Sequence, residues 1–467
     1  MMAAHRCPVQ ALEQGFSKQL DAIIEQFCGG NVQNGVAVAY SGGLDSTVLL
    51  DLTVKYCRQI NIPLYAFHIH HGLSPNADAW LSHCQASCDA YGISFFPKRI
   101  TVTTDTGDGL EASARKGRYH ALGQLAKDHQ IKLIVAAHHQ DDQAETLLLQ
   151  LLRGSGVAGM SGMDICNLAP DLFGHDEVML ARPLLTEKRA TLEACLAKYQ
   201  LSCIEDESNF DHRYVRNAIR HQVMPILEKI SPGYSERLGR SALHFQSAQN
   251  LLAEMAAGDL AACKLGDGLD IQAMRQLSVD RIDNLLRYWL SQAGIRMPTT
   301  ARLKEMQSQL FGGRGDARIT VHHGKHAIHR FKNAVFLSEA GNKPADPGLS
   351  IKFTWQGQAS IHFPEFAGTL HFELHDYGLE PEWLQRQQLS LHLRRGGERL
   401  KLADNRHTRD MKSHYQTLQI PFWQRERLPF LFEKANLLFA AGVGMQSSFC
   451  THGDKARIRL SWSFDTN

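Results

Sequence analysis

The sequence predicts an α/β protein whose amino-terminal half forms a doubly wound, mostly parallel sheet, followed by a small α-rich domain and a β-rich α+β domain. Three observations support this fold class. Short apolar runs alternate with helix-length segments up to about residue 230, two adjacent glycines follow the first run closely, and short strand-like segments fill the chain beyond about residue 349. Strands that alternate with helices form parallel sheets, whereas consecutive short strands are typical of antiparallel sheets.

The elements of the first domain, expected over residues 1–230, follow from this alternation. An amphipathic helix precedes the first strand, because Leu12, Phe16 and Leu20 recur on one helix face. Strands are then expected at 36–39, 64–69, 93–100, 131–137 and 178–185, and helices at 46–57, 76–91, 111–129, 144–153 and 186–200. Parallel sheets bind ligands at the carboxyl ends of their strands, so functional residues are expected in the loops that follow strands.

Two breaks divide the rest of the chain. Ser231-Pro-Gly ends the first domain, and residues 231–340 are expected to form an α-rich middle domain because helical periodicity extends to about residue 310. Residues 341–348 have the composition of a linker, and residues 349–467 are expected to form a carboxyl-terminal domain. Within 390–467, 13 Lys and Arg stand against 7 Asp and Glu, whereas the whole chain has 50 basic and 48 acidic residues. A surface for a polyanion such as tRNA is therefore expected in the last domain.

The composition argues against several classes of protein. The ten cysteines include no CxxC pair, which disfavours a zinc ribbon or an iron–sulfur cluster and is typical of reduced thiols. No apolar run approaches the roughly 20 residues that a membrane helix needs. Acidic residues interrupt the apolar positions near the amino terminus, where a secretory signal would lie. We therefore expect a cytoplasmic protein.

The first strand leads into the turn Ser41-Gly-Gly-Leu-Asp-Ser46, which we call the phosphate cradle. Gly42 and Gly43 can both take positive φ values, which lets backbone N–H groups approach an anion closely. A helix is expected from Ser46, so its free N–H groups and partial positive charge point at the same anion. No lysine follows the glycines, unlike in the GxxxxGK[ST] loop. The alternative is a glycine-containing turn that binds no ligand.

A second group of candidates follows the strand at 131–137. His138, Asp142 and Glu145 are separated by four and three residues, which brings them onto one helix face at a strand end. Carboxylates beside a triphosphate can hold Mg²⁺, and His138 can contact phosphate or transfer a proton. The alternative is a solvated helix terminus that is acidic because of the helix dipole.

Two pairs of arginines are further candidates. Arg115 and Arg118 lie one helical turn apart, and Arg216 and Arg220 are spaced to share one side of a helix. Arginine is suited to bidentate contacts with phosphate oxygens, including those of an RNA backbone. Taken alone, each pair is equally compatible with ordinary surface arginines.

Taken together, these blocks resemble the tRNA(Ile)-lysidine synthase branch of the pyrophosphate-loop ATPase family, whose catalytic domain is Rossmann-like. The resemblance covers the whole first domain and parts of the last. Its motifs are SGGLDS at 41–46, HHGL at 70–73, EASARKGRY at 111–119, AHHQDDQAET at 137–146, RPLL at 182–185, LHLRRGGERL at 391–400 and LLFAAGVGM at 437–445. One departure is the run that starts at Lys401, where the family often has a more glycine-rich basic segment.

The resemblance implies an ATP-dependent ligase. It would join L-lysine to C2 of the wobble cytidine of a tRNA(Ile) with a CAU anticodon, through an adenylated cytidine, with ATP cleaved to AMP and pyrophosphate. ATP and Mg²⁺ are the implied cofactors, and a homodimer is compatible with the sequence. Two alternatives stay open: another tRNA-modifying enzyme of the same family, such as a thiolase, and a non-catalytic tRNA-binding protein on the same fold.

The resemblance also implies roles for individual residues. Asp45 and Asp142 would hold Mg²⁺, and Arg216 would support the reactive base, with Arg220 as the other candidate for that contact. His138, Arg115 and Glu145 would act at the α-phosphate and the lysine site. The pyrophosphate of ATP would be held by the cradle residues Ser41, Gly42, Gly43, Asp45 and Ser46.

Overall fold

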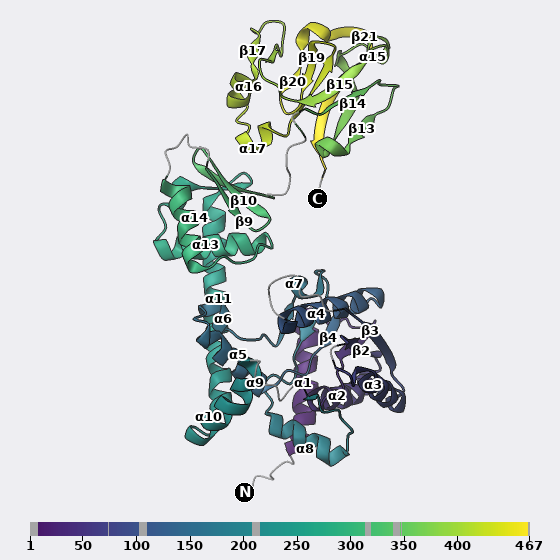
Figure 1. Ribbon diagram of the computed structural model, residues 1–467, viewed down its shortest axis with the longest axis vertical. Helices are drawn as coiled ribbons and strands as arrows, with labels where there is room; N and C mark the ends of the chain where they lie inside the picture. Colours follow the sequence, from purple (N-terminus) through teal and green to yellow (C-terminus); the bar gives the residue numbers. More distant parts are fainter. Residues whose placement is uncertain are drawn as a thin grey trace. The chain divides into compact units, whose positions relative to one another are not determined.

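The computed structural model describes residues 8–72, 74–101, 110–207, 215–312, 319–339, 346 and 348–465. The chain divides into two compact units, residues 1–255 and 256–467 (Figure 1). The finer division into domains at 1–230, 231–340 and 349–467 stays a prediction.

The first unit is built on one six-stranded sheet with the order β3-β2-β1-β4-β6-β5. All of its strands except β5 run parallel, which confirms the predicted fold class; β5 pairs antiparallel with β6. The strands are β1 (Val36–Ala39), β2 (Leu64–His70), β3 (Ser94–Arg99), β4 (Leu133–Val135), β5 (Cys166–Leu168) and β6 (Met179–Ala181). The short strand β5 was not expected from the sequence.

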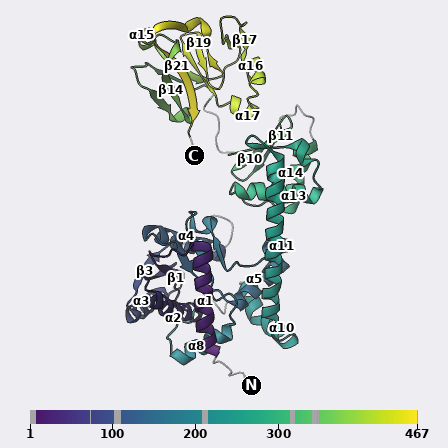
Figure 2. The ribbon, with the colours of Figure 1, turned by 180° about the vertical axis from the view of Figure 1, so that it is seen from behind.

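Helices cover both faces of this sheet, as the alternation of side chains in β1 requires. Val36 and Val38 pack in one core with α1, α2, α3 and α8, whereas Ala37 packs in the other core with α4. Figure 2 shows α1 running along its face of the sheet above α8. The helices are α1 (Pro8–Cys28), α2 (Leu44–Ile60), α3 (Ala77–Tyr91), α4 (Leu110–Asp128), α5 (Gln140–Leu152), α6 (Val157–Met160), α7 (Pro170–Phe173) and α8 (Arg189–Tyr199).

A bent helical segment completes the first unit. It consists of α9 (Val215–Ala218), a π-helical turn η2 (Ile219–Val223) and α10 (Met224–Ile230). The predicted break at Ser231 is present as a tight turn, because α10 ends there and α11 (Tyr234–Cys263) begins three residues later. Ile219 and Met224 pack with Ala144 of α5 and Tyr234 of α11 in a small separate core, which fixes the segment against α5.

The second unit has two parts, each with its own β-sheet structure and its own hydrophobic core. In the first, helices pack on an antiparallel sheet of order β7-β8-β11-β10-β9. Its elements are β7 (Lys264–Leu265), β8 (Gly268–Asp270), α12 (Ile271–Met274), α13 (Val279–Gln292), α14 (Thr300–Gly312), β9 (Ile319–His323), β10 (His326–Phe331) and β11 (Ala334–Glu339). β9 and β10 form a hairpin that carries four histidines, of which His329 is hydrogen-bonded to Thr320 and Ser338.

The carboxyl-terminal part is antiparallel, as predicted. A five-stranded sheet of order β12-β15-β18-β19-β20 and a three-stranded sheet of order β13-β14-β21 share one core. The elements are β12 (Ser350–Phe353), β13 (Ser360–Phe363), η3 (Pro364–Phe366), β14 (Gly368–Gly378), α15 (Pro381–Gln385), β15 (Leu389–Leu393), β16 (Arg399–Leu400), β17 (Arg409–Asp410), α16 (Met411–Thr417), α17 (Phe422–Arg425), β18 (Pro429–Glu433), β19 (Asn436–Ala440), β20 (Gly444–Met445), η4 (Ser447–Phe449) and β21 (Thr451–Phe464). Across the described residues of both units, every helix is too short or too polar to span a membrane.

Candidate active site

The phosphate cradle depends on one glycine in a left-handed conformation. Gly42 has a φ of +85°, and a Cβ atom there would lie 2.5 Å from Ile204 Cδ1 and 2.8 Å from Cys84 Sγ. Its carbonyl oxygen accepts hydrogen bonds from Ile204 N at 2.8 Å and from Thr47 Oγ1 at 3.1 Å. The expectation of a positive φ was wrong for Gly43, which is extended at φ −70°, because it serves as the N-cap of α2. The backbone conformation and the close neighbours therefore require glycine at position 42, whereas the φ of position 43 does not.

The hydroxyl groups of Ser41 and Ser46 link the two ends of the cradle by hydrogen bonds. Ser46 Oγ donates to Gly43 O at 3.0 Å, lies 3.0 Å from Ser41 Oγ, and accepts from Ser41 N at 3.3 Å. Gly43 has no side chain with which to cap α2. The first amides of that helix have no partner within the helix, so they are available to an anion. The cradle thus combines a rigid turn with open N–H donors.

Asp45 is the charged member of the cradle, and it meets groups from two other helices. Its Oδ2 lies 3.7 Å from His139 Nε2 and 3.6 Å from Arg189 Nη1. Its Oδ1 is buried and has no hydrogen-bond partner among the described residues. A buried carboxylate oxygen without a partner is costly. It therefore fits a cation ligand.

His139 caps α5 and is almost completely buried, with 1% of its surface exposed. Burial lowers its pKa, but the carboxylates of Asp45, Asp142 and Asp141 outweigh burial and raise the pKa above the ordinary value. The sequence prediction chose His138 and missed His139. The sequence signal that could have identified His139 was its position next to His138. Adjacent side chains at a strand end point in different directions, so the two histidines can contact different groups.

The carboxylates of α5 are paired with two arginines of the bent helical segment. We call Asp142, Glu145, Arg216 and Arg220 the carboxylate–arginine cluster. Asp142 Oδ1 accepts from Arg216 Nη2 at 3.1 Å and from Arg220 Nη2 at 2.9 Å. Glu145, which is fully buried, accepts from Arg216 Nε at 2.8 Å and from Arg220 Nε at 2.5 Å. Both arginines therefore contact both carboxylates, and Arg220 lies in the π-helical turn, a feature frequent at functional sites.

The cluster keeps Asp142 ionised. Burial raises the pKa of Asp142, but the charges of His139, His138, Arg216 and Arg220 outweigh burial and lower the pKa to about 2. Its Oδ2 also accepts a hydrogen bond from His139 N at 3.1 Å. Asp142 is therefore a charged group whose two oxygens already have partners.

His138 lies within electrostatic reach of both Asp142 and the arginines. Burial is the largest cause that lowers its pKa to about 3; the charge of Asp142 opposes this, whereas those of Arg182, Arg115 and Arg216 lower the pKa further. The imidazole is therefore neutral near pH 7 and can bind as a hydrogen-bonding group. Its Nδ1 is buried without a hydrogen-bond partner among the described residues.

Arg115 and Arg118 flank the buried ring of Tyr119, with guanidinium carbons 5.0 Å and 5.6 Å from the ring centroid. Burial lowers the pKa of Arg118, and the charges of Arg115 and Arg216 lower it further, so these arginines lie in one basic region. Arg182, from the RPLL motif, is also buried; it donates to Asp164 O and Asn167 Oδ1. The side chain of Glu111 lies outside the described residues.

The predicted site residues thus fall into three groups. The cradle residues lie together, Asp142, Glu145 and Arg216 form one cluster, and His138 and Arg115 lie beside that cluster within electrostatic reach. No group of three or more His, Cys, Asp or Glu side chains in the described part of the chain is arranged to hold a metal ion. Mg²⁺ is commonly held by one or two carboxylates plus substrate phosphates, which the open oxygen of Asp45 fits.

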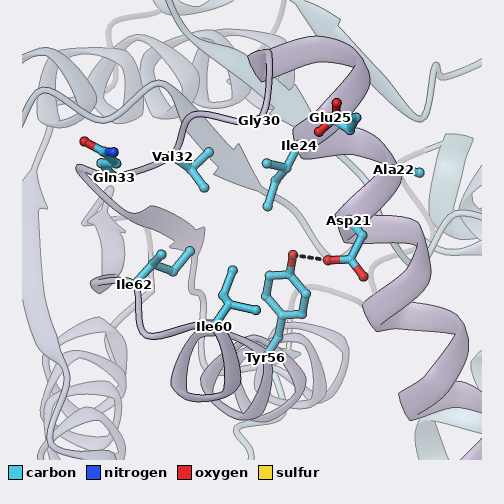
Figure 3. A pocket seen from close by; sticks show the side chains of 10 residues that line it. All are labelled: Asp21, Ala22, Ile24, Glu25, Gly30, Val32, Gln33, Tyr56, Ile60 and Ile62. Carbon is cyan, nitrogen blue, oxygen red and sulfur yellow. Dashed lines mark hydrogen bonds between the residues drawn. The ribbon is translucent and has the colours of Figure 1, made fainter.

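A pocket of about 500 Å³ lies away from these groups, at the far end of α2 (Figure 3). Tyr56 of α2 points into it and donates a hydrogen bond to Asp21 at 2.6 Å. Ile60, also on α2, is 14 residues after Ser46, which places this pocket roughly 20 Å along the helix from the cradle. The amino-terminal end of α2, not this pocket, carries the candidate chemistry.

Three family models match three successive parts of the chain. A PP-loop domain matches residues 12–227, the TilS substrate binding domain matches residues 269–336, and the TilS substrate C-terminal domain matches residues 389–462. Among solved structures, U34-tRNA thiolase NcsA from Methanococcus maripaludis shares 18% identity over 51% of this chain and 80% of its own, with a TM-score of 0.42. That likeness is too weak to bear on function.

Curated relatives match nearly the whole chain. A tRNA(Ile)-lysidine synthase from Alkalilimnicola ehrlichii is 37% identical over 89% of this chain and 91% of its own length. Another from Ralstonia nicotianae is 38% identical over 90% of each chain. These relatives favour neither the thiolase nor the non-catalytic alternative. With matches of this identity and coverage, the chain belongs to the tRNA(Ile)-lysidine synthase family.

Proposed function

We propose that this protein ligates lysine to C2 of the wobble cytidine of a tRNA(Ile) with a CAU anticodon. In the first step the cytidine O2 attacks the α-phosphorus of ATP and pyrophosphate leaves. In the second step the lysine ε-amine attacks C2, AMP leaves with the former O2, and the amine loses a proton. The observation that carries this proposal is the anion-binding cradle beside the carboxylate–arginine cluster in a chain of this family.

The cradle supports the assignment of the pyrophosphate site. Ser41, Gly42, Gly43 and Ser46 offer backbone and hydroxyl donors and no negative charge, which suits the β- and γ-phosphates of ATP. Asp45 and Asp142 are the residues that would hold Mg²⁺. When bound, that ion would offset the negative charge that develops during phosphoryl transfer.

The other residues divide into anion and cation partners. Arg115 and the neutral His138 suit the α-phosphate, the first as a charge and the second as a hydrogen-bond partner. Glu145 suits the lysine ammonium or a base-contacting arginine, because it is a buried carboxylate. Arg216 and Arg220 make equivalent contacts with Asp142 and Glu145, so both are candidates for the contact with the wobble base.

The carboxyl-terminal domain is proposed to bind the tRNA. Exposed arginines gather between β15 and β17, where an RNA backbone would find positive charge. Glu398 accepts from the amides of Arg395 at 2.5 Å and Gly396 at 2.8 Å, which orders this loop. The exposed residues are Arg394, Arg395, Arg399, Arg406 and Arg409.

The decisive experiment is incubation of the pure protein with ATP, Mg²⁺, radiolabelled lysine and unmodified tRNA(Ile). Label is expected in tRNA(Ile) and not in elongator methionine tRNA. Absence of label from both tRNAs, with folded protein, would refute the proposal.

We also propose that the protein resides in the cytoplasm. A possible homodimer is tested by measuring the molar mass by light scattering at several protein concentrations.

Asp45→Ala tests the division of labour between the cradle and the tRNA surface. The variant is expected to lose ATP-dependent adenylation and to keep its affinity for tRNA, because the proposed contacts with the tRNA backbone lie in the other unit. Adenylation is measured by tRNA-dependent release of pyrophosphate, and affinity by filter binding. Loss of both properties in a folded variant would contradict this division.

A further inference from the structure

Arg189 is a charged residue beside the cradle that has no part in the roles described above. Its Nη1 lies 3.6 Å from Asp45 Oδ2, and its Nε lies 3.2 Å from Glu193 Oε1 one turn along α8. The side chain is 38% exposed. A partly exposed guanidinium between two carboxylates is held weakly, so it can change partner at little cost in free energy.

The backbone of Arg189 is nevertheless fixed to the active-site helix α5. Arg189 N donates to Asp141 Oδ2 at 3.1 Å. Immediately upstream, Glu187 O accepts from Gln140 N at 2.9 Å and Thr186 O accepts from Gln140 Nε2 at 3.3 Å. The start of α8 is therefore positioned by the helix that carries Asp142 and Glu145, while the end of the Arg189 side chain can reorient.

We propose that Arg189 binds the pyrophosphate portion of a nucleoside triphosphate in the cradle, and that its contact with Asp45 is the position it takes without nucleotide. This inference rests on the proposed function. The cradle's own donors are neutral, so a highly charged pyrophosphate group needs a nearby cation. The planar guanidinium matches two phosphate oxygens at once. When Arg189 turns to phosphate, Asp45 Oδ2 keeps only His139 as a charged neighbour, and Oδ1 stays open to a cation.

The test uses direct binding to the full-length protein. Pyrophosphate, ATP and AMP are titrated calorimetrically, without tRNA, into the wild type, Arg189→Gln and Arg189→Lys. Loss of a charge-assisted hydrogen bond predicts a roughly 10- to 100-fold weaker affinity of Arg189→Gln for pyrophosphate and ATP. AMP, which has no β- or γ-phosphate, should bind all three proteins alike. Arg189→Lys should recover part of the affinity, because it restores the charge without the planar fork.

Glu193→Gln is the matched control, because it removes the other partner of Arg189 and leaves the cradle unchanged. It should bind pyrophosphate within about threefold of the wild type, since an exposed ion pair contributes little. Equal losses for AMP and pyrophosphate in Arg189→Gln, or no loss for either, would overturn the inference. Failure of the wild type to label tRNA with lysine would instead overturn the proposed function, so the two failures are distinguishable.

Discussion

The phosphate cradle holds its shape with hydrogen bonds between uncharged groups, whereas the carboxylate–arginine cluster beside it pairs two carboxylates with two arginines. In the cradle, Ser41, Gly43 and Ser46 contact one another over at most five residues of chain. In the cluster, Arg216 and Arg220 reach carboxylates 71 to 78 residues away. One half of the site is therefore local and rigid, and the other is assembled by the tertiary fold.

This difference bears on what must happen when substrates bind. The first amides of α2 have no partner within the helix, so they can bind an anion without breaking a helical hydrogen bond. Both oxygens of Asp142 and the whole of Glu145 are engaged by other groups. A metal ion, a lysine ammonium or a base must compete with those contacts. We infer that the cluster is the part of the site whose contacts change during the reaction.

The largest effect is expected in the cradle, from Gly42→Ala. A left-handed φ costs an alanine roughly 1–2 kcal/mol, and the contacts of its Cβ with Ile204 and Cys84 add about 1–3 kcal/mol. Because the turn itself must shift, ATP affinity should fall by two orders of magnitude or more, at about 1.4 kcal/mol for each tenfold loss. Urea unfolding measures the first effect and calorimetric titration of ATP the second.

Gly92→Ala is the matched control for this prediction. Gly92 has a φ of +67°, and nothing lies within 4 Å of the position its Cβ would take. It should therefore lose only the free energy of backbone strain, and its ATP affinity should stay at the wild-type value. Equal losses in the two variants would show that the close contacts of Gly42 do not matter.

The second prediction concerns the cluster, where Glu145→Gln leaves two arginines with one carboxylate. Removing one partner of a buried ion pair typically costs 3–5 kcal/mol. Arg216 and Arg220 are about a quarter exposed, so we expect about 3 kcal/mol at the lower end of this range. The measurement is the free energy of unfolding from urea denaturation at low and high salt.

The control for the cluster is Glu305→Gln, which removes an exposed ion pair with Arg302 at 2.7 Å. Exposed pairs contribute less than about 1 kcal/mol and are screened by salt. If Glu145→Gln were no more destabilising than Glu305→Gln, the cluster would not differ from ordinary surface charges. The contrast with the cradle would then be lost.

The comparison also explains how much of the site could be predicted from the sequence. The cradle was predictable because its strand, glycines and helix are neighbours in the chain, although the φ of Gly43 was not, since two adjacent glycines leave open which one turns. Asp142 and Arg216 were each identified as candidates, but their pairing was not, because it depends on how the segment beyond residue 215 packs on α5. Arg189 was not identified as a candidate, because its approach to Asp45 depends on how α8 packs against α2.

The parallel sheet could be predicted because its central strands β1 and β4 are short apolar runs buried on both faces. The strand β5 could not, since Cys166–Leu168 has only one buried residue and owes its conformation to pairing with β6. The order of the strands likewise follows from packing over long sequence separations, which no local pattern records.

The smallest effect distinguishes the two adjacent histidines, whose pKa values are shifted in opposite directions. The pKa of His138 is lowered to about 3 in the folded protein, so the unfolded chain binds more protons below pH 6.5. Its contribution to stability is present above pH 6.5 and is lost as the pH falls. The pKa of His139 is raised, so its contribution is present below pH 6.5 and is lost as the pH rises through the folded pKa.

His138→Gln and His139→Gln should therefore change the pH dependence of stability in opposite directions. For His138→Gln the change is about 1 kcal/mol for each pH unit below pH 6.5. His138→Gln should flatten the loss of stability between pH 6.5 and 5, and His139→Gln should flatten the loss above pH 6.5. The measurement is urea unfolding from pH 5 to 8.5 without nucleotide and with a chelator. Parallel shifts of the two profiles would mean that both histidines share one electrostatic environment.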